Sequence, residues 1–152
     1  MLNFTNLEQS FILTDSLGID PNTADCYILW IGGGERTRIT EHHIIPEGKT
    51  YDDIKNDYSS CQPSWSVYAL MKLLPYSIKV WNDDAGRYGK IVEYYLNIDP
   101  GETIEYSYLD GEDDNGTCIS RPLKENPVGE LIFVLSTIKR ITKTLHMKEP
   151  NQ

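Results

Sequence analysis

The sequence predicts an α+β fold, with an antiparallel sheet of three to five strands and three helices packed on one side of it. Two neighbouring segments alternate apolar and polar residues, as strands with one buried face do. Other segments place apolar residues at the three- and four-residue spacing of a helix that covers a core. The chain has 152 residues, the usual size of one domain, so we expect residues 1–152 to form a single domain.

Helix signals occur in three segments. Residues 6–17 begin at Asn6, a residue type that caps helices, and are followed by a glycine suited to a helix C-terminus. A serine-capped segment with an apolar stripe ends at Pro75. The last helix is predicted to begin at Pro127, behind the capping residue Asn126.

Strand signals are concentrated in the middle of the chain. Segments rich in β-branched and aromatic residues predict strands at 26–31, 77–82, 91–98 and 103–109. Residues 32–34, three glycines, are expected to turn the first strand back into a partner at 36–40. Residues 41–62 are predicted to be mostly loop, although a stretch of that length can also hold a short helix or a binding surface.

The last two predicted strands are expected to form a hairpin. Their inward residues have even numbers on both strands, so the connecting loop must hold an odd number of residues. Residues 99–101 fit as a three-residue loop whose glycine takes the left-handed conformation. The expected register places Leu96 opposite Ile104 and Tyr95 opposite Glu105.

Composition bounds the function. A net charge of −9 and a pI near 4.7 disfavour nucleic acid as a partner, because its phosphates attract Lys and Arg. No apolar run is long enough to span a bilayer, and the N-terminus lacks the features of a signal peptide, so we expect a cytoplasmic protein. Cys26, Cys61 and Cys118 are predicted to be free thiols, because they are widely spaced and odd in number.

Two motif-like segments fail the tests for known cofactor sites, and we expect no cofactor and no metal ion. Residues 31–36 are glycine-rich but lack the endings of nucleotide-binding loops. The acidic loop 110–116 has Asn115 and Arg121 where a calcium loop begun at Asp110 needs Gly and Glu. These segments are interpreted as a hairpin tip and a solvated loop.

Candidate functional residues are few. Tyr95 is predicted to face outward with Glu93 and Glu105, and these three form our candidate protein-binding residues. Tyr and Trp are enriched at protein interfaces, and the chain has ten Tyr and three Trp. The expected register puts Glu93 opposite Ser107, so the two carboxylates are diagonal neighbours at best and a poor acid–base pair.

Three blocks of the sequence resemble a known group of proteins. They are the opening residues 6–25, the segment 63–75, which is similar to a P-[AS]-W-S-L-x-A-L-L-x-L-L-P signature, and the close from Asn126. The chain thereby resembles small uncharacterised proteins of phages and mobile elements of Bacteroides-type gut bacteria. Cys26 departs from the pattern, because many relatives have Met there. The resemblance implies a genomic setting, with no mechanism and no site residues.

These observations favour a non-catalytic accessory protein of a phage or mobile element that binds a host or phage protein. The alternative is a small nucleotide- or nucleic-acid-directed enzyme with a site assembled from scattered groups such as His42, Cys61 and the acidic loop 110–116. A third reading, a mimic of DNA, requires carboxylates arrayed in rows.

Overall fold

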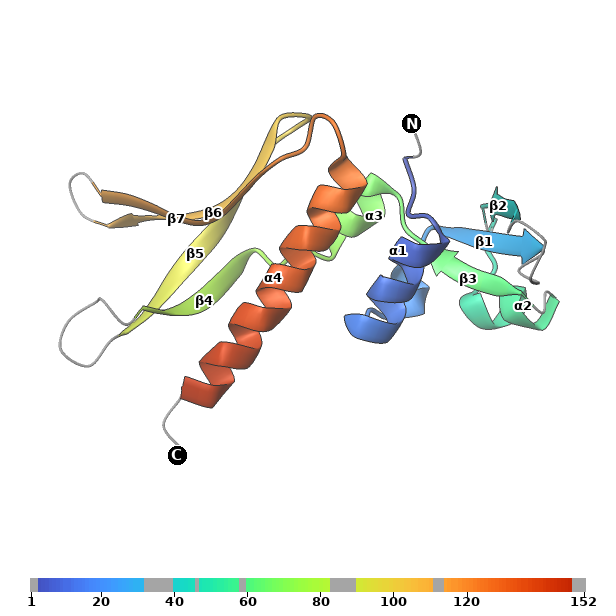
Figure 1. The fold of residues 1–152 in the computed structure, drawn as a ribbon, viewed down its shortest axis with the longest axis horizontal. Helices are drawn as coiled ribbons and strands as arrows, with labels where there is room; N and C mark the ends of the chain where they lie inside the picture. Colours follow the sequence, from blue (N-terminus) through green and yellow to red (C-terminus); the bar gives the residue numbers. More distant parts are fainter. Residues whose placement is uncertain are drawn as a thin grey trace. The chain divides into compact units, whose positions relative to one another are not determined.

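The computed structural model describes residues 3–31, 40–45, 47–57, 60–82, 90–110 and 114–148 (Figure 1). Contacts divide the chain into two compact units, Met1–Leu73 and Leu74–Gln152. The predicted α+β class with antiparallel strands is confirmed. The strands make two sheets, of three and four strands, instead of the one sheet that we expected. The single-domain assignment of residues 1–152 stays a prediction.

The first unit is built on the three-stranded sheet, in the order β2-β1-β3. Its elements are α1 (Leu7–Phe11), the π-helical turn η1 (Ile12–Ser16), the 3-10 turn η2 (Pro21–Thr23), β1 (Cys26–Ile31), β2 (Thr40–Ile44), α2 (Tyr51–Asp57), β3 (Cys61–Ser64) and α3 (Val67–Lys72). The central strand β1 is antiparallel to both neighbours, and its Ile28 pairs with His43 and Gln62.

The first predicted helix is confirmed, and a capping box fixes its start. The Asn6 side chain accepts a hydrogen bond from the Gln9 amide at 2.8 Å, and the Gln9 side chain accepts one from the Asn6 amide at 2.9 Å. The helix then widens into η1, where the Leu17 amide bonds the Ile12 carbonyl five residues back. Gly18 follows with a positive φ of 65°.

The prediction of loop across residues 41–62 is wrong. The strand that returns from β1 is β2, which begins at Thr40, and residues 32–39 lie outside the described part of the chain. α2 follows, and Thr50 and Asp53 cap it by exchanging bonds between side chain and backbone at 3.1 and 3.3 Å. The short-helix alternative for this stretch is therefore confirmed, and β3 completes the sheet.

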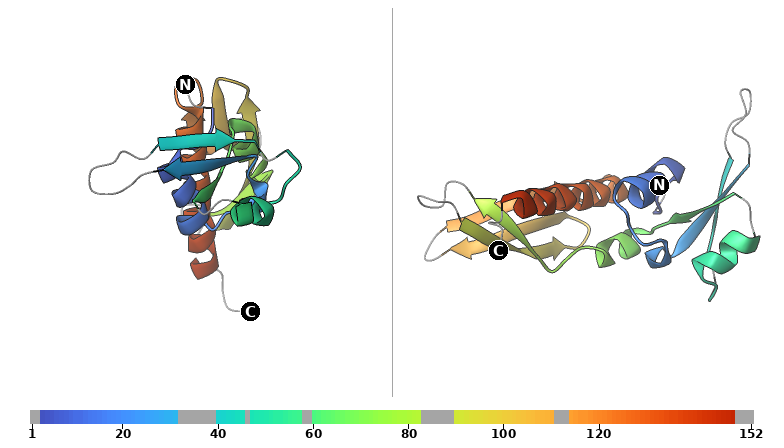
Figure 2. Two further views of the ribbon diagram at one scale, coloured as in Figure 1. Left: turned by 90° about the vertical axis from the view of Figure 1, so that its right-hand side faces the viewer. Right: turned by 90° about the horizontal axis from the view of Figure 1, so that it is seen from below.

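Helices cover both faces of the three-stranded sheet (Figure 2). On one face Gln62, paired with Ile28, donates to the Ser10 carbonyl at the end of α1. On the other face Tyr27 stacks on Tyr51 of α2, with ring centroids 6.1 Å apart. Successive residues on a strand point to opposite faces. Cys26, Tyr27 and Ile28 are nevertheless all buried, which requires cover on both sides.

The second unit is a four-stranded antiparallel meander crossed by one long helix (Figure 1). Its elements are β4 (Ser77–Asn82), β5 (Lys90–Asp99), β6 (Thr103–Asp110), β7 (Asp114–Pro122) and α4 (Pro127–Lys148). The predicted strands 77–82, 91–98 and 103–109 and the predicted C-terminal helix are confirmed. No helix among the described residues is long and apolar enough to cross a membrane.

The register of the β5–β6 hairpin differs from the prediction by two residues. Tyr95 lies opposite Ser107 and Ile98 opposite Ile104, so the parity of the inward residues is right and the pairing is wrong. The cause is the turn, in which the Glu102 amide bonds the Asp99 carbonyl at 3.0 Å. Pro-Gly takes the two central positions of that turn, which places the turn one residue later than we assumed.

β7 was missed in the sequence, where residues 110–116 were interpreted as a solvated loop. The strand pairs with β6 along its length and has an irregularity at Tyr106/Ser107. Its sequence contains Asp, Asn, Gly and Pro, which are depleted in strands. Pairing with β6, rather than intrinsic propensity, therefore makes this segment a strand. Residues 111–113 lie outside the described part of the chain.

The core of the second unit lies between α4 and one face of the sheet. The even-numbered residues of the strands that face α4 are buried, among them Ile78, Tyr94, Ile104 and Tyr106. The helix residues Val128, Leu131, Val134 and Leu135 are buried as well. Near its start the helix is also tied to β7, because Arg121 forms a two-point ion pair with Glu130, at 2.5 and 3.1 Å.

Candidate functional site: the open face of the four-stranded sheet

Among the described residues of the second unit, no helix lies on one face of the four-stranded sheet. Figure 2 shows α4 along a single side of these strands. Side chains alternate along a strand, and the odd-numbered residues of β4, β5 and β6 pair with one another. They therefore share a face with Tyr95 and point away from α4. We call this surface the open face and define it by Lys79, Ile91, Glu93, Tyr95, Asn97, Asp99 and Glu105. Its strands are ordinary one-face-buried antiparallel strands, which the alternating sequence predicts.

An exposed aromatic pair lies on this side of the sheet. The Tyr95 side chain is 45% exposed and Tyr76, just before β4, is 76% exposed. The two rings meet edge to face with centroids 5.8 Å apart. Edge-to-face contact holds each ring in a defined orientation. The pair therefore presents two amphipathic rings to solvent, and binding to them would cost little further side-chain entropy.

The charge of the open face is mainly negative. Among the described strand residues it carries three carboxylates, those of Glu93, Asp99 and Glu105, against one cation, Lys79. Lys79 lies directly opposite Glu93, and the Ser77 hydroxyl donates a hydrogen bond to the Glu93 carboxylate at 2.7 Å. This bond holds the Glu93 carboxylate beside Tyr95.

The structure brings the three candidate protein-binding residues onto the open face. Tyr95 is exposed, as predicted, and lies between the two carboxylates along the sheet. In the observed register Glu105 pairs with Asn97, so it is four positions, roughly 13 Å, along the strands from Glu93. Carboxylates so far apart do not share a substrate atom. Glu93 and Glu105 are therefore not placed as an acid–base pair.

Two groups suggested for an assembled active site, His42 and Cys61, are held apart within the first unit. His42 and Cys61 both pair with Leu29, from opposite sides of β1, so two strand spacings of about 10 Å separate their backbones. Burial raises the pKa of the Cys61 thiol to about 11, so it is protonated and a weak nucleophile near neutral pH. The acidic loop 110–116 belongs to the other unit, and part of it lies outside the described residues.

Metal sites and disulfides are also missing from the described residues. No cluster of three or more His, Cys, Asp or Glu side chains in the described ranges is placed to hold an ion. Cys26, Cys61 and Cys118 are free thiols, as predicted, and burial raises the pKa of each to about 11. The thiols are therefore packing groups at neutral pH.

A buried polar network in the first unit escaped the sequence analysis. The Thr5 hydroxyl bonds the hydroxyls of Ser10 and Ser64 at 2.7 and 3.0 Å and accepts from the Trp65 amide at 3.0 Å. All three hydroxyl residues are fully buried. No side-chain polar atom buried in the described chain lacks a partner. The network joins the N-terminal segment to β3, so we interpret it as structural.

Comparison with known proteins adds no identity to this geometry. No family model, no curated protein and no solved structure matches the chain. The candidate site therefore stands on the described residues alone.

Proposed function

We propose that this protein is a non-catalytic accessory protein that binds a protein partner through the open face of its four-stranded sheet. The observation that carries the proposal is the exposed pair of Tyr76 and Tyr95 beside the carboxylates of Glu93 and Glu105. Tyrosine is a frequent anchor at protein interfaces. An aromatic pair with carboxylates near it favours a partner segment that contains arginine or lysine.

Arginine matches both features of this face. Its guanidinium stacks on a tyrosine ring and forms two-point bonds with a carboxylate. An arginine of this unit already makes contacts of both kinds: the Arg121 guanidinium lies 4.3 Å from the centroid of the Phe133 ring and forms a two-point ion pair with Glu130. A mimic of DNA requires carboxylates in rows. On the open face the carboxylates are interrupted by Tyr95 and Lys79, so this surface fits a basic protein segment better than an enzyme that binds DNA.

The setting of the proposal follows from the sequence resemblance. We place the protein in the cytoplasm of a bacterial host, encoded by a phage or mobile element, with a host or phage protein as partner. The net charge of −9 supports a basic protein partner over nucleic acid. The enzyme alternative loses support because His42 and Cys61 are not brought together.

Photocrosslinking in the host cell tests the proposal. A photoreactive phenylalanine analogue replaces Tyr95 on the open face, and in a control it replaces Tyr68, which is 66% exposed in the first unit. We expect an adduct from position 95 alone, and sequencing of the crosslinked peptide should identify a segment rich in Arg or Lys. The same adducts from both positions, no adduct from position 95, or an acidic crosslinked segment would refute the proposal.

A further inference from the structure

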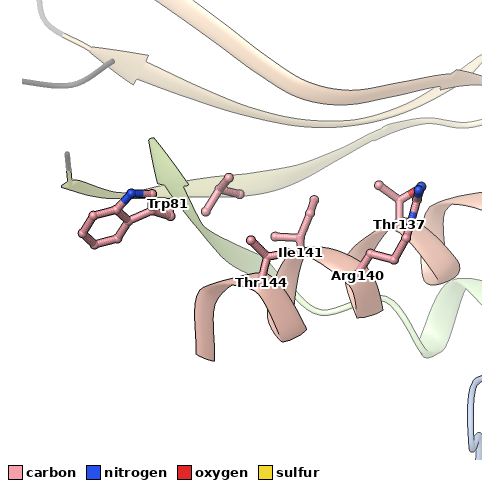
Figure 3. A pocket seen from close by; sticks show the side chains of 6 residues that line it. Trp81, Thr137, Arg140, Ile141 and Thr144 are labelled. Carbon is pink, nitrogen blue, oxygen red and sulfur yellow. The ribbon is translucent and has the colours of Figure 1, made fainter. Parts of the chain in front are cut away.

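A groove runs between the edge strand β4 and the C-terminal half of α4 (Figure 3). Its volume is about 380 Å³, and it is lined by Val80, Trp81, Thr137, Arg140, Ile141 and Thr144. Pockets that bind small molecules are commonly of this size. The groove is within the second unit, and no carboxylate of the open face is among its lining residues.

Helix periodicity explains why the helical lining residues occur together. Thr137, Ile141 and Thr144 follow one another at four and three residues, which places them on one side of α4. Val80 and Ile141 supply aliphatic surface to the groove. In Figure 3 the Trp81 ring lies at one end, and the Arg140 and Thr137 side chains lie at the other. The groove thus has an apolar length and one polar, cationic end.

The cationic end is built from Arg140 and Thr137. One guanidinium nitrogen of Arg140 donates to the Thr137 hydroxyl at 3.4 Å, and that hydroxyl donates to the Phe133 carbonyl at 2.8 Å. Within the described ranges Arg140 forms no ion pair with a carboxylate, and the Thr137 contact uses one of the five N–H donors of its guanidinium. This long contact places the guanidinium beside Thr137 at one end of the groove.

The surrounding charge favours an anion although the whole chain is acidic. Residues 139–148 include four cations, Lys139, Arg140, Lys143 and Lys148, and no carboxylate side chain. A guanidinium prefers a carboxylate, whose two oxygens match its two N–H groups. The indole and aliphatic groups provide contact area for an apolar body.

We propose that this groove binds a small carboxylic acid with an aromatic or aliphatic body, whose carboxylate pairs with Arg140 and whose body lies over Ile141 toward Trp81. The inference goes beyond the proposed function, because it concerns a second surface and a small-molecule ligand. Neither site requires the other, so the two proposals fail or succeed separately.

The test compares three probes of one shape on the full chain by NMR titration: naphthaleneacetate, its primary amide and the corresponding naphthylethylamine. We expect the acid to bind at least about tenfold more tightly than the amide, with the largest shifts in the signals of Trp81 and Ile141. Equal affinity for acid and amide, tighter binding of the amine, or no saturable binding of the acid at millimolar concentration would overturn the proposal.

Matched variants locate the charge recognition. Arg140→Ala should abolish the preference for the acid over the amide, and Arg140→Lys should restore part of it because the positive charge returns without the planar fork. Lys143→Ala removes the same charge from the same helix at a residue that does not line the groove, and should leave the preference unchanged. Equal losses from both alanine variants would show non-specific attraction and contradict the assignment.

Two acidic residues follow β4 in the sequence, Asp83 and Asp84, outside the described residues. The Asp83→Asn/Asp84→Asn variant therefore completes the set. The variant removes two negative charges that directly follow β4 in the sequence. The affinity for the acid should stay the same or rise. A lower affinity in this variant would contradict recognition of an anion at this groove.

Discussion

The two sheets of this protein differ in how many of their faces are covered. In β1 the neighbours Tyr27 and Ile28 are 2% and 0% exposed, although they point to opposite faces. In β5 the neighbours Tyr94 and Tyr95 are 8% and 45% exposed. The middle of β1 is therefore covered on both faces, whereas β5 is covered on one face and exposed on the other at Tyr95.

The number of helices per sheet produces this difference. The first unit places α1 with η1 on one face and α2 on the other, whereas in the described part of the second unit α4 is the one helix for four strands. A sheet needs cover on one face to form a core, and an antiparallel sheet tolerates water on the other. A helix packed on the second face leaves no sheet surface exposed there for binding. We therefore place the proposed binding surface in the second unit.

The largest expected effects come from alanine substitutions at these neighbouring pairs. Tyr27→Ala and Ile28→Ala should each lower the free energy of unfolding by about 3 kcal/mol, because each leaves a cavity. Tyr94→Ala should cost about 3 kcal/mol, whereas Tyr95→Ala should cost less than about 1 kcal/mol. Urea denaturation followed by NMR signals from each unit measures all four. A large loss for Tyr95→Ala would show that the open face is covered.

A smaller effect is expected in the polar core of the three-stranded sheet. Thr5→Val removes the hydroxyl that bonds Ser10, Ser64 and the Trp65 amide, and leaves those groups buried without it. The cost should be about 2 kcal/mol. The matched variant Thr5→Ser keeps the hydroxyl and should cost about 1 kcal/mol or less. Equal costs for the two variants, again by urea denaturation, would contradict a structural role for the hydroxyl.

Strong local signals made most of the fold predictable. Three of these signals are local: the cap Asn6, the apolar stripe of the C-terminal helix and the alternation in β5 and β6. Each predicted its helix or strand correctly. The register was off by two, because alternation determines which face a residue takes and leaves the pairing partner to the turn. β7 has no local signal, since its strand state depends on the neighbouring β6.

The candidate site was predictable only in part, for a similar reason. Alternation indicated that Tyr95, Glu93 and Glu105 share a face, but only the pairing of strands shows how far apart the carboxylates lie. Tyr76 was missed because it precedes the strand and joins the face through tertiary contact with Tyr95. The groove beside Arg140 was missed because β4 and α4 are distant in sequence.

A peptide titration of the purified full chain tests the central claim, that the open face binds basic protein segments, most directly. Short peptides of alternating Arg and Ser, and matched peptides of Glu and Ser, are added while backbone and tyrosine NMR signals are followed. The account predicts saturable shifts with the Arg peptide at Tyr76, Glu93 and Tyr95, weakened by salt and by Tyr95→Ala. Shifts centred on the three-stranded sheet, or equal binding of the Glu peptide, would contradict it.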